Sequence, residues 1–298
     1  MRTMTRVAAA ALILVATVAF AGAAEAKKPT RLYVALGDSL SVGVQPLKSG
    51  KNVNTRQGYA NQLAKLVGGL KLVDYGCGNA TTRSFIDGSR PCAPARKPGY
   101  KNTSAKTSQL AAAERFLKKN RSKIAFVTID IGANDLQICS KNGGIDVNCV
   151  NQGIANIKKF APKIAKGLRK AGGKKLPMAV TTLYDPFLQQ WFNGSLGQVI
   201  AKASVDLAKK QVNPAITKSF KPQGFKVAKT DVAFKTYTPF SQTTSFRGRN
   251  DVPVAVATIC KLTHMCDPTP RGPNIHANKA GYAVMAKEFR KALGRAAR

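Results

Sequence analysis

The segment IAFVTIDI, residues Ile124–Ile131, decides the fold that we predict for this chain. It is the most strand-like stretch of the sequence and is almost continuously apolar, which is typical of a strand buried on both faces of a sheet. Sheets that are covered on both faces are mostly parallel, with helices packed above and below. The segment therefore predicts an α/β protein.

Strands and helices alternate on both sides of this segment. Short apolar runs predict further strands over Leu32–Leu36, Leu70–Tyr75, Pro177–Leu183 and Phe225–Ala228. Apolar residues at helical spacing predict helices over Gly58–Val67, Ser104–Lys119, Ile154–Ala171, Gln198–Phe220 and Asn278–Ala297. This alternation predicts about five parallel strands with helices on both faces, and sites on such sheets lie at the carboxyl ends of the strands.

Composition limits the class of protein and its partners. The chain has 298 residues, 48 Lys and Arg against 14 Asp and Glu, and a formal charge of +34. Its 44% hydrophobic content argues against disorder, and two histidines without a close Cys-x2-Cys pair argue against a zinc site. The lysines are spread along the chain, so we expect a solvated surface that attracts polyanions nonspecifically, such as acidic wall polymers or anionic lipid headgroups. With one Trp and no basic helix carrying interleaved aromatic residues, the sequence does not predict specific nucleic-acid binding.

The N-terminal residues have the pattern of a secretory signal. Met1–Arg6 is basic, Val7–Phe20 is apolar but too short to span a bilayer, and Ala24-Glu25-Ala26 resembles a cleavage site. We therefore predict a signal peptide over 1–26, a single domain over 27–298 and a secreted protein.

All six cysteines follow this predicted cleavage site, as expected for an oxidising compartment. They form three local couples, each bracketing a polar or very short loop, although six cysteines allow 15 pairings. The expected disulfides are Cys77–Cys92, Cys139–Cys149 and Cys260–Cys266.

Four polar segments lie where the predicted strands end or just before the last helix. Gly37-Asp38-Ser39-Leu40 follows the first strand, and a tight turn over 76–82 follows the second. Gly132-Ala133-Asn134-Asp135 follows the third, and a segment over 274–278 contains His276. A serine, backbone N–H groups, an amide and a histidine at one edge are the parts of acyl transfer: nucleophile, oxyanion donors and general base.

These segments, in this order, resemble the motifs of the SGNH (GDSL) hydrolase superfamily, in particular its secreted actinobacterial esterases and lipases. The resemblance implies a three-layer, flavodoxin-like fold and an ester hydrolase that needs no metal or cofactor. It implies that Ser39 is the nucleophile and His276 the base. The implied oxyanion donors are the backbone N–H of Ser39, a backbone N–H at Gly78 or Asn79, and the side chain of Asn134.

Two positions depart from the family pattern. Asn79 falls where the family has glycine, unless Gly78 takes that role, and Asn tolerates unusual φ better than most residues. The family's third catalytic residue, an Asp three positions before the histidine, is replaced by Pro273. Either Asp267 folds back to His276, or a backbone carbonyl orients the ring in a Ser–His dyad, and we favour the dyad. His264 competes as the base, but it lies outside every motif.

Two functions follow from these observations. The first is a secreted, monomeric serine esterase or lipase that acts on a lipid, a small ester or an acetylated sugar. The alternative is a non-catalytic wall- or polyanion-binding protein on the same fold, which the missing acid at Pro273 slightly favours. Ser39, Asn134 and His276 together favour the enzyme, because a binding protein needs none of them.

Overall fold

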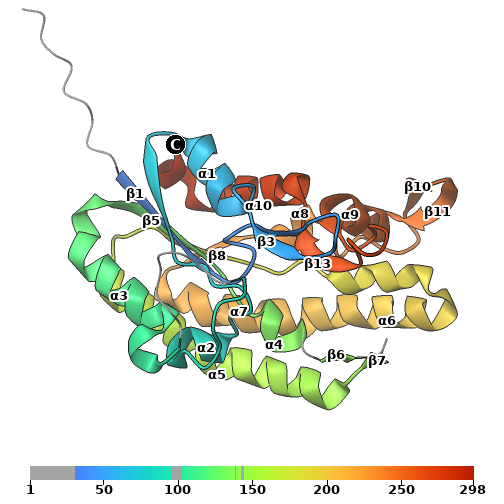
Figure 1. Ribbon diagram of the computed structural model, residues 1–298, viewed down its shortest axis with the longest axis horizontal. Helices are drawn as coiled ribbons and strands as arrows, with labels where there is room; N and C mark the ends of the chain where they lie inside the picture. The colour runs from blue at the N-terminus through green and yellow to red at the C-terminus, as the bar shows by residue number, and fades with distance from the viewer. Residues whose placement is uncertain (1–30, 95–102, 138, 142–143) are drawn as a thin grey trace, which may run out of the picture.

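A five-stranded parallel sheet forms the centre of the molecule (Figure 1). The computed structural model describes residues 31–94, 103–137, 139–141 and 144–298, so the predicted signal peptide lies outside the described residues. The strands are β1 (Arg31–Gly37), β4 (Leu70–Asp74), β5 (Ile124–Asp130), β8 (Met178–Thr181) and β9 (Lys226–Ala228). Their order is β4-β1-β5-β8-β9, and every neighbouring pair is parallel. This confirms the predicted fold class and all five predicted strands.

Helices cover both faces of the sheet, as predicted, and each face has its own apolar core. One face packs against α2 (Thr82–Asp87), α3 (Gln109–Asn120), α5 (Val147–Gly172) and α7 (Asn213–Phe220). The other packs against α1 (Tyr59–Val67), α9 (Val254–Leu262) and α10 (Lys279–Leu293). The two sets lie on opposite sides of the sheet in Figure 1. Strand β1 contributes to both cores because alternate side chains point to opposite faces: Val34 to the first and Tyr33 to the second.

Three predicted helices differ from the observed ones. The helix predicted over Ser104–Lys119 begins as α3 at Gln109, because Ser108 caps it by accepting the N–H of Ala111, and a separate 3₁₀ helix η1 (Ala105–Thr107) precedes it. Helix α5 begins at Val147 rather than at Ile154, because the Asp146 side chain caps its first turn by accepting the N–H of Cys149. The helix predicted over Gln198–Phe220 starts earlier and is divided into α6 (Gly194–Leu207), a π-helical turn η4 (Ala208–Val212) and α7. Pro214 lies just after this turn and has no N–H to donate to the preceding helical turn.

The segments between the predicted elements contain helices and strands that the sequence pattern did not predict. They include α4 (Ala133–Gln137), the 3₁₀ helix η3 (Pro186–Phe192), α8 (Thr230–Ala233) and α9. Antiparallel pairs are formed by β2 (Val44–Pro46) with β3 (Asn52–Asn54), β6 (Ser140–Lys141) with β7 (Gly144–Ile145), β10 (Thr243–Phe246) with β11 (Arg249–Pro253), and β12 (Thr263–His264) with β13 (Asn274–Ala277). Within the described residues, no helix combines the length and apolar character needed to cross a membrane.

The six cysteines form the three predicted disulfides. Their Cα–Cα distances are 4.8 Å for Cys77–Cys92, 5.3 Å for Cys139–Cys149 and 5.1 Å for Cys260–Cys266. The first holds the turn after β4, the second joins the segment after α4 to α5, and the third joins α9 to the loop after β12. All three therefore fix loops at the edge of the sheet rather than its core.

Candidate active site

Ser39 lies in a tight turn directly after β1. Gly37 has φ of +127°, and a Cβ there would meet the backbone oxygen of Asp130 at 2.0 Å, so the turn requires glycine. The Asp38 N–H donates to Asp130 Oδ2 (3.0 Å), and Asp38 Oδ1 accepts the N–H of Leu40 (3.0 Å). Asp38 thus holds the turn that presents Ser39.

The structure brings Ser39 and His276 together across 237 positions of sequence. His276 lies on β13, and its Nε2 is 2.9 Å from Ser39 Oγ. Both residues are largely buried, with 7% of each surface exposed. This is the hydrogen-bonded nucleophile–base contact expected for acyl transfer.

The acceptor for the other ring nitrogen is the side chain of Asn274. Its Oδ1 lies 2.6 Å from His276 Nδ1 and accepts the backbone N–H of His276 at 3.1 Å. A backbone N–H can only donate, so this amide atom is the oxygen, and Nδ1 facing it must carry a hydrogen. The Asn274 Nδ2 donates to Asn52 Oδ1 (3.0 Å), which fixes the amide in the same orientation. Nε2 is therefore the unprotonated nitrogen of the neutral ring and accepts from Ser39.

The sequence offered two candidates for the group that orients the His276 ring, the Asp267 carboxylate and a backbone carbonyl, and both were wrong. Asp267 does not reach His276; its Oδ2 lies 2.7 Å from His264 Nδ1 and 3.1 Å from Arg271 Nε. The reason is local, because the Asp267 N–H donates to the His264 carbonyl (3.3 Å) and this turn folds the carboxylate onto His264. A side-chain amide oxygen, rather than a backbone carbonyl, holds the His276 ring. The adjacent polar residue Asn274 was the available signal in the sequence.

The surroundings of His276 favour its neutral form. Burial, and secondly the nearby His264, lower its pKa from 6.5 to about 4. The imidazole is therefore unprotonated, and able to accept a proton, through the whole neutral pH range.

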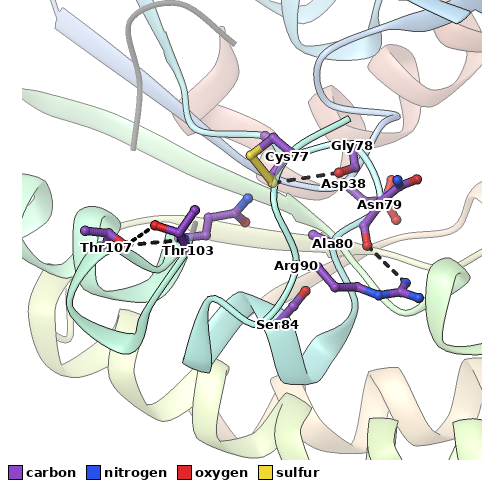
Figure 2. The surroundings of a disulfide bond; sticks show 12 residues. Asp38, Cys77, Gly78, Asn79, Ala80, Ser84, Arg90, Thr103 and Thr107 are labelled. Atoms are coloured by element: carbon purple, nitrogen blue, oxygen red, sulfur yellow. Dashed lines mark hydrogen bonds between the residues drawn. A yellow bond between two sulfur atoms is a disulfide. The ribbon is translucent and has the colours of Figure 1, made fainter. Parts of the chain in front are cut away.

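The turn over Gly76–Ala80, after β4, is bonded to the end of β1 just before Ser39, because the Cys77 N–H donates to the Gly37 carbonyl (3.0 Å). Figure 2 shows this turn with Gly78 and Asn79 labelled. A Cβ on Gly78 would meet the Ala93 carbonyl oxygen at 1.9 Å, so this position cannot accept a side chain. Asn79 has φ of +68°, the left-handed conformation that glycine usually provides. Gly78 is therefore required by close packing, whereas the position of Asn79 is constrained by its positive φ, which asparagine can adopt.

Helix α4 places Asn134 at the same edge. Asn134 Nδ2 donates to the Ala80 carbonyl (3.0 Å), while the Asp135 carboxylate accepts the N–H (2.9 Å) and hydroxyl (2.7 Å) of Thr82. Burial raises the pKa of Asp135 to about 6. These bonds make Asp135 an anchor of the loop rather than a catalytic acid, and they fasten α4 to the turn after β4.

An apolar cavity of about 460 Å³ extends from Ser39 and Asn134. Its walls come from α4, the start of α5, the segment over 183–187, and the α6–η4 helix. Aliphatic and aromatic side chains of these elements line it, among them Leu136, Val150, Leu183, Phe187, Ile200 and Leu207. Its size is within the range of small-molecule binding sites.

Comparison with known proteins identifies the family of this chain. Residues 33–289 match the family model described as GDSL-like lipase/acylhydrolase, and the chain belongs to this family of ester hydrolases. A sequence search found no match among curated proteins.

Solved structures with similar folds include two Streptomyces enzymes. Phospholipase A1 from Streptomyces albidoflavus NA297 is 18% identical, with a TM-score of 0.50 over 89% of this chain and 100% of that one. An extracellular lipase from Streptomyces rimosus is 16% identical, with a TM-score of 0.49 over 88% of this chain and 99% of that one. At this identity, the phospholipase supports the fold alone.

Proposed function

We propose that this enzyme is an exported serine esterase that cleaves carboxylic esters of apolar acyl groups. The observation that carries the proposal is the contact between Ser39 Oγ and His276 Nε2 at the end of an apolar cavity. Ser39 attacks the ester carbonyl carbon while its proton passes to His276 Nε2. The C–O bond then breaks, and the leaving alcohol takes that proton. Water attacks the acyl-enzyme, gives a proton to Nε2, and Ser39 recovers it as the carboxylic acid leaves.

Three N–H donors support the negative charge that develops on the carbonyl oxygen. In this proposal they are the backbone N–H of Ser39, a backbone N–H of the Gly78–Asn79 turn, and the second amide hydrogen of Asn134, whose first is bonded to Ala80. The disulfide at Cys77 and the bonds of Asp135 hold these donors in place before substrate arrives, so they need little reorganisation.

The lining of the cavity favours an acyl chain over a sugar as the group bound beside Ser39. A sugar hydroxyl needs hydrogen-bond partners, and the lining offers few of them, such as Gln137, Asn151 and Gln211, among mostly apolar side chains. Each methylene buried there contributes about 0.8 kcal/mol. The preferred substrate is accordingly a fatty acyl ester rather than an acetylated sugar.

Export is supported by the three disulfides, because such bonds persist in oxidising compartments. The N-terminal pattern over residues 1–26 points the same way.

A panel of p-nitrophenyl esters from acetyl to palmitoyl tests this function. We expect kcat/KM to rise with chain length until the cavity is filled, and Ser39→Ala to abolish turnover without lowering Tm. Ala203→Trp, which places a large ring at the cavity wall, should reduce hydrolysis of long esters while sparing acetate. A serine-directed phosphonate should label Ser39.

Equal rates for the wild type and Ser39→Ala on every ester would refute the enzyme mechanism and favour the non-catalytic alternative. If the wild type prefers acetate esters, and Ala203→Trp keeps that preference, the cavity does not bind the acyl chain. That result would refute the proposed substrate but not the esterase activity.

A further inference from the structure

Exposed aliphatic side chains surround the mouth of the cavity. Val147, at the start of α5, is 66% exposed, and Val199, on α6, is 62% exposed, yet both line the cavity. Leu196, one turn before Val199, is 73% exposed. These are three of the most exposed large apolar residues in the described part of the chain, and they come from the two helices that form one opening. A cluster of this kind indicates a surface that another apolar phase covers.

Lysines extend the same groove away from Ser39. A second hollow lies between α5 and the α6–η4–α7 helix, and it shares Gln211 with the first cavity, so the two adjoin. Three exposed lysines line it: Lys158 on α5, Lys210 on η4 and Lys218 on α7. Lys210 is paired with Asp206 at 2.9 Å.

The helices on either side of this hollow carry many basic residues and almost no acidic ones. Helix α5 contains no Asp or Glu, and its cations are Lys158, Lys159, Lys163, Lys166, Arg169 and Lys170. Over residues 194–220 Asp206 is the single carboxylate. Lys158, Lys210 and Lys218 therefore place positive charge next to the exposed apolar mouth, with Asp206 as the one carboxylate on the two helices that line the second hollow.

We infer that this surface, formed by Val147, Leu196 and Val199 with Lys158, Lys210 and Lys218, docks the enzyme onto an anionic lipid bilayer. The aliphatic residues enter the acyl region, and the lysines contact headgroup phosphates. An acidic polymer would match the lysines but would gain nothing from Leu196, which favours the bilayer as the partner. The inference rests on the proposed function because docking aligns the mouth of the Ser39 cavity with a source of acyl esters.

Vesicle co-sedimentation tests the inference without turnover, using the Ser39→Ala protein. Vesicles of phosphatidylcholine with about one quarter phosphatidylglycerol should bind much more protein than phosphatidylcholine alone, and high salt should reverse this. Each lysine near an anionic surface strengthens binding by about fivefold. The double variant Lys158→Glu/Lys218→Glu should therefore bind at least about tenfold more weakly.

Matched controls lie on the opposite face of the sheet. Lys65→Glu/Lys287→Glu, on α1 and α10, makes the same change in charge at exposed sites and should have a much smaller effect. Leu196→Ser should weaken vesicle binding several-fold, whereas Leu66→Ser, on α1, should not. In a Ser39-intact background, the lysine variants should hydrolyse a soluble short ester at the normal rate but vesicle esters more slowly.

Equal losses from the two lysine pairs would overturn the inference, because attraction would then depend only on net charge. No effect of Leu196→Ser, with equally strong binding to soluble polyglutamate, would overturn it in favour of an acidic polymer. Neither result affects the ester hydrolase, which the soluble-ester assay tests separately.

Discussion

Asn274 Oδ1 accepts the Nδ1–H of His276 at 2.6 Å, in the role that a carboxylate has in a Ser–His–Asp triad. The amide fixes the tautomer and orientation of the ring, as the carboxylate does. It does not supply the negative charge that stabilises the imidazolium formed during Ser39 attack. His276, the proposed base, is therefore held in one orientation and has a low pKa of about 4, without the carboxylate of a full triad.

Restoring the carboxylate should change the pH profile. Protonation of His276 removes the base, so kcat/KM of the wild type should fall only below about pH 4. In Asn274→Asp the negative charge raises the pKa of His276, and the acid limb should move to higher pH, with kcat rising by up to about tenfold at neutral pH.

Asn274→Ala removes the acceptor from two N–H groups of His276 and should lower kcat by at least about tenfold. Rates measured from pH 4 to 9, with circular dichroism to confirm folding, distinguish these cases. An unchanged acid limb in Asn274→Asp would contradict the positioning role of Asn274.

Asp267 should matter little for turnover. Its carboxylate contacts His264 and Arg271, not His276, so Asp267→Asn should reduce kcat by less than about tenfold, or about 1.4 kcal/mol. His276→Ala should abolish activity, and His264→Ala should be mild. Steady-state kinetics of the three variants check this. A loss above about a thousandfold in a folded Asp267→Asn protein would show that this carboxylate acts on the base after all.

The ionisation of the buried Asp185 carboxyl should make the stability of the protein depend on pH. Its Oδ1 accepts the N–H of Phe187 (2.9 Å) and its Oδ2 accepts the hydroxyl of Ser204 (2.7 Å), while burial raises its pKa from 3.8 to about 6. Between pH 3.8 and about pH 6, the Asp185 carboxyl is more often protonated in the folded state than in the unfolded state. Ionisation of Asp185 therefore lowers the free energy of unfolding as the pH rises through this range.

Asp185→Asn keeps both contacts, because its amide can donate to Ser204, whose hydroxyl also reaches the Ala201 carbonyl. The variant should be more stable than the wild type at pH 8, by up to about 3 kcal/mol, and equally stable near pH 4. Denaturant unfolding at both pH values measures this difference. A variant that is less stable at pH 8 would show that the ionised carboxylate is needed.

The Cys260–Cys266 disulfide should support the base. It encloses β12, whose Thr263 pairs with Ala277 on β13, the strand that carries His276. Replacing both cysteines by serine should cost at most about 2 kcal/mol of stability, because the loop is short, but should lower kcat several-fold. The matched Cys139→Ser/Cys149→Ser variant alters the cavity wall and should affect long esters more than acetate. If both double variants lost kcat on acetate to the same extent, the Cys260–Cys266 disulfide would have no special role in supporting His276.

The sequence by itself determined the sheet, its two helical layers and the segments that carry Ser39, Asn134 and His276. Periodicity reports burial, and an apolar run such as Ile124–Ile131, with strands and helices alternating around it, is typical of a strand buried on both faces of a parallel sheet. The carboxyl ends of the strands of such a sheet meet at one edge, so the sequence alone places the polar segments that follow the strands there. The disulfides could also be predicted, because each joins cysteines close in sequence.

Only the tertiary structure decided which group holds His276 and where the apolar cavity beside Ser39 lies. Asp267 and Asn274 are both near the base in sequence, and the pairing of β12 with β13, which sets His264 opposite Asn274, determines which one reaches the ring. The cavity depends in the same way on how α4, α5 and α6 meet. Such contacts are set by distances of a few ångströms between distant segments, and sequence periodicity reports only which faces are buried.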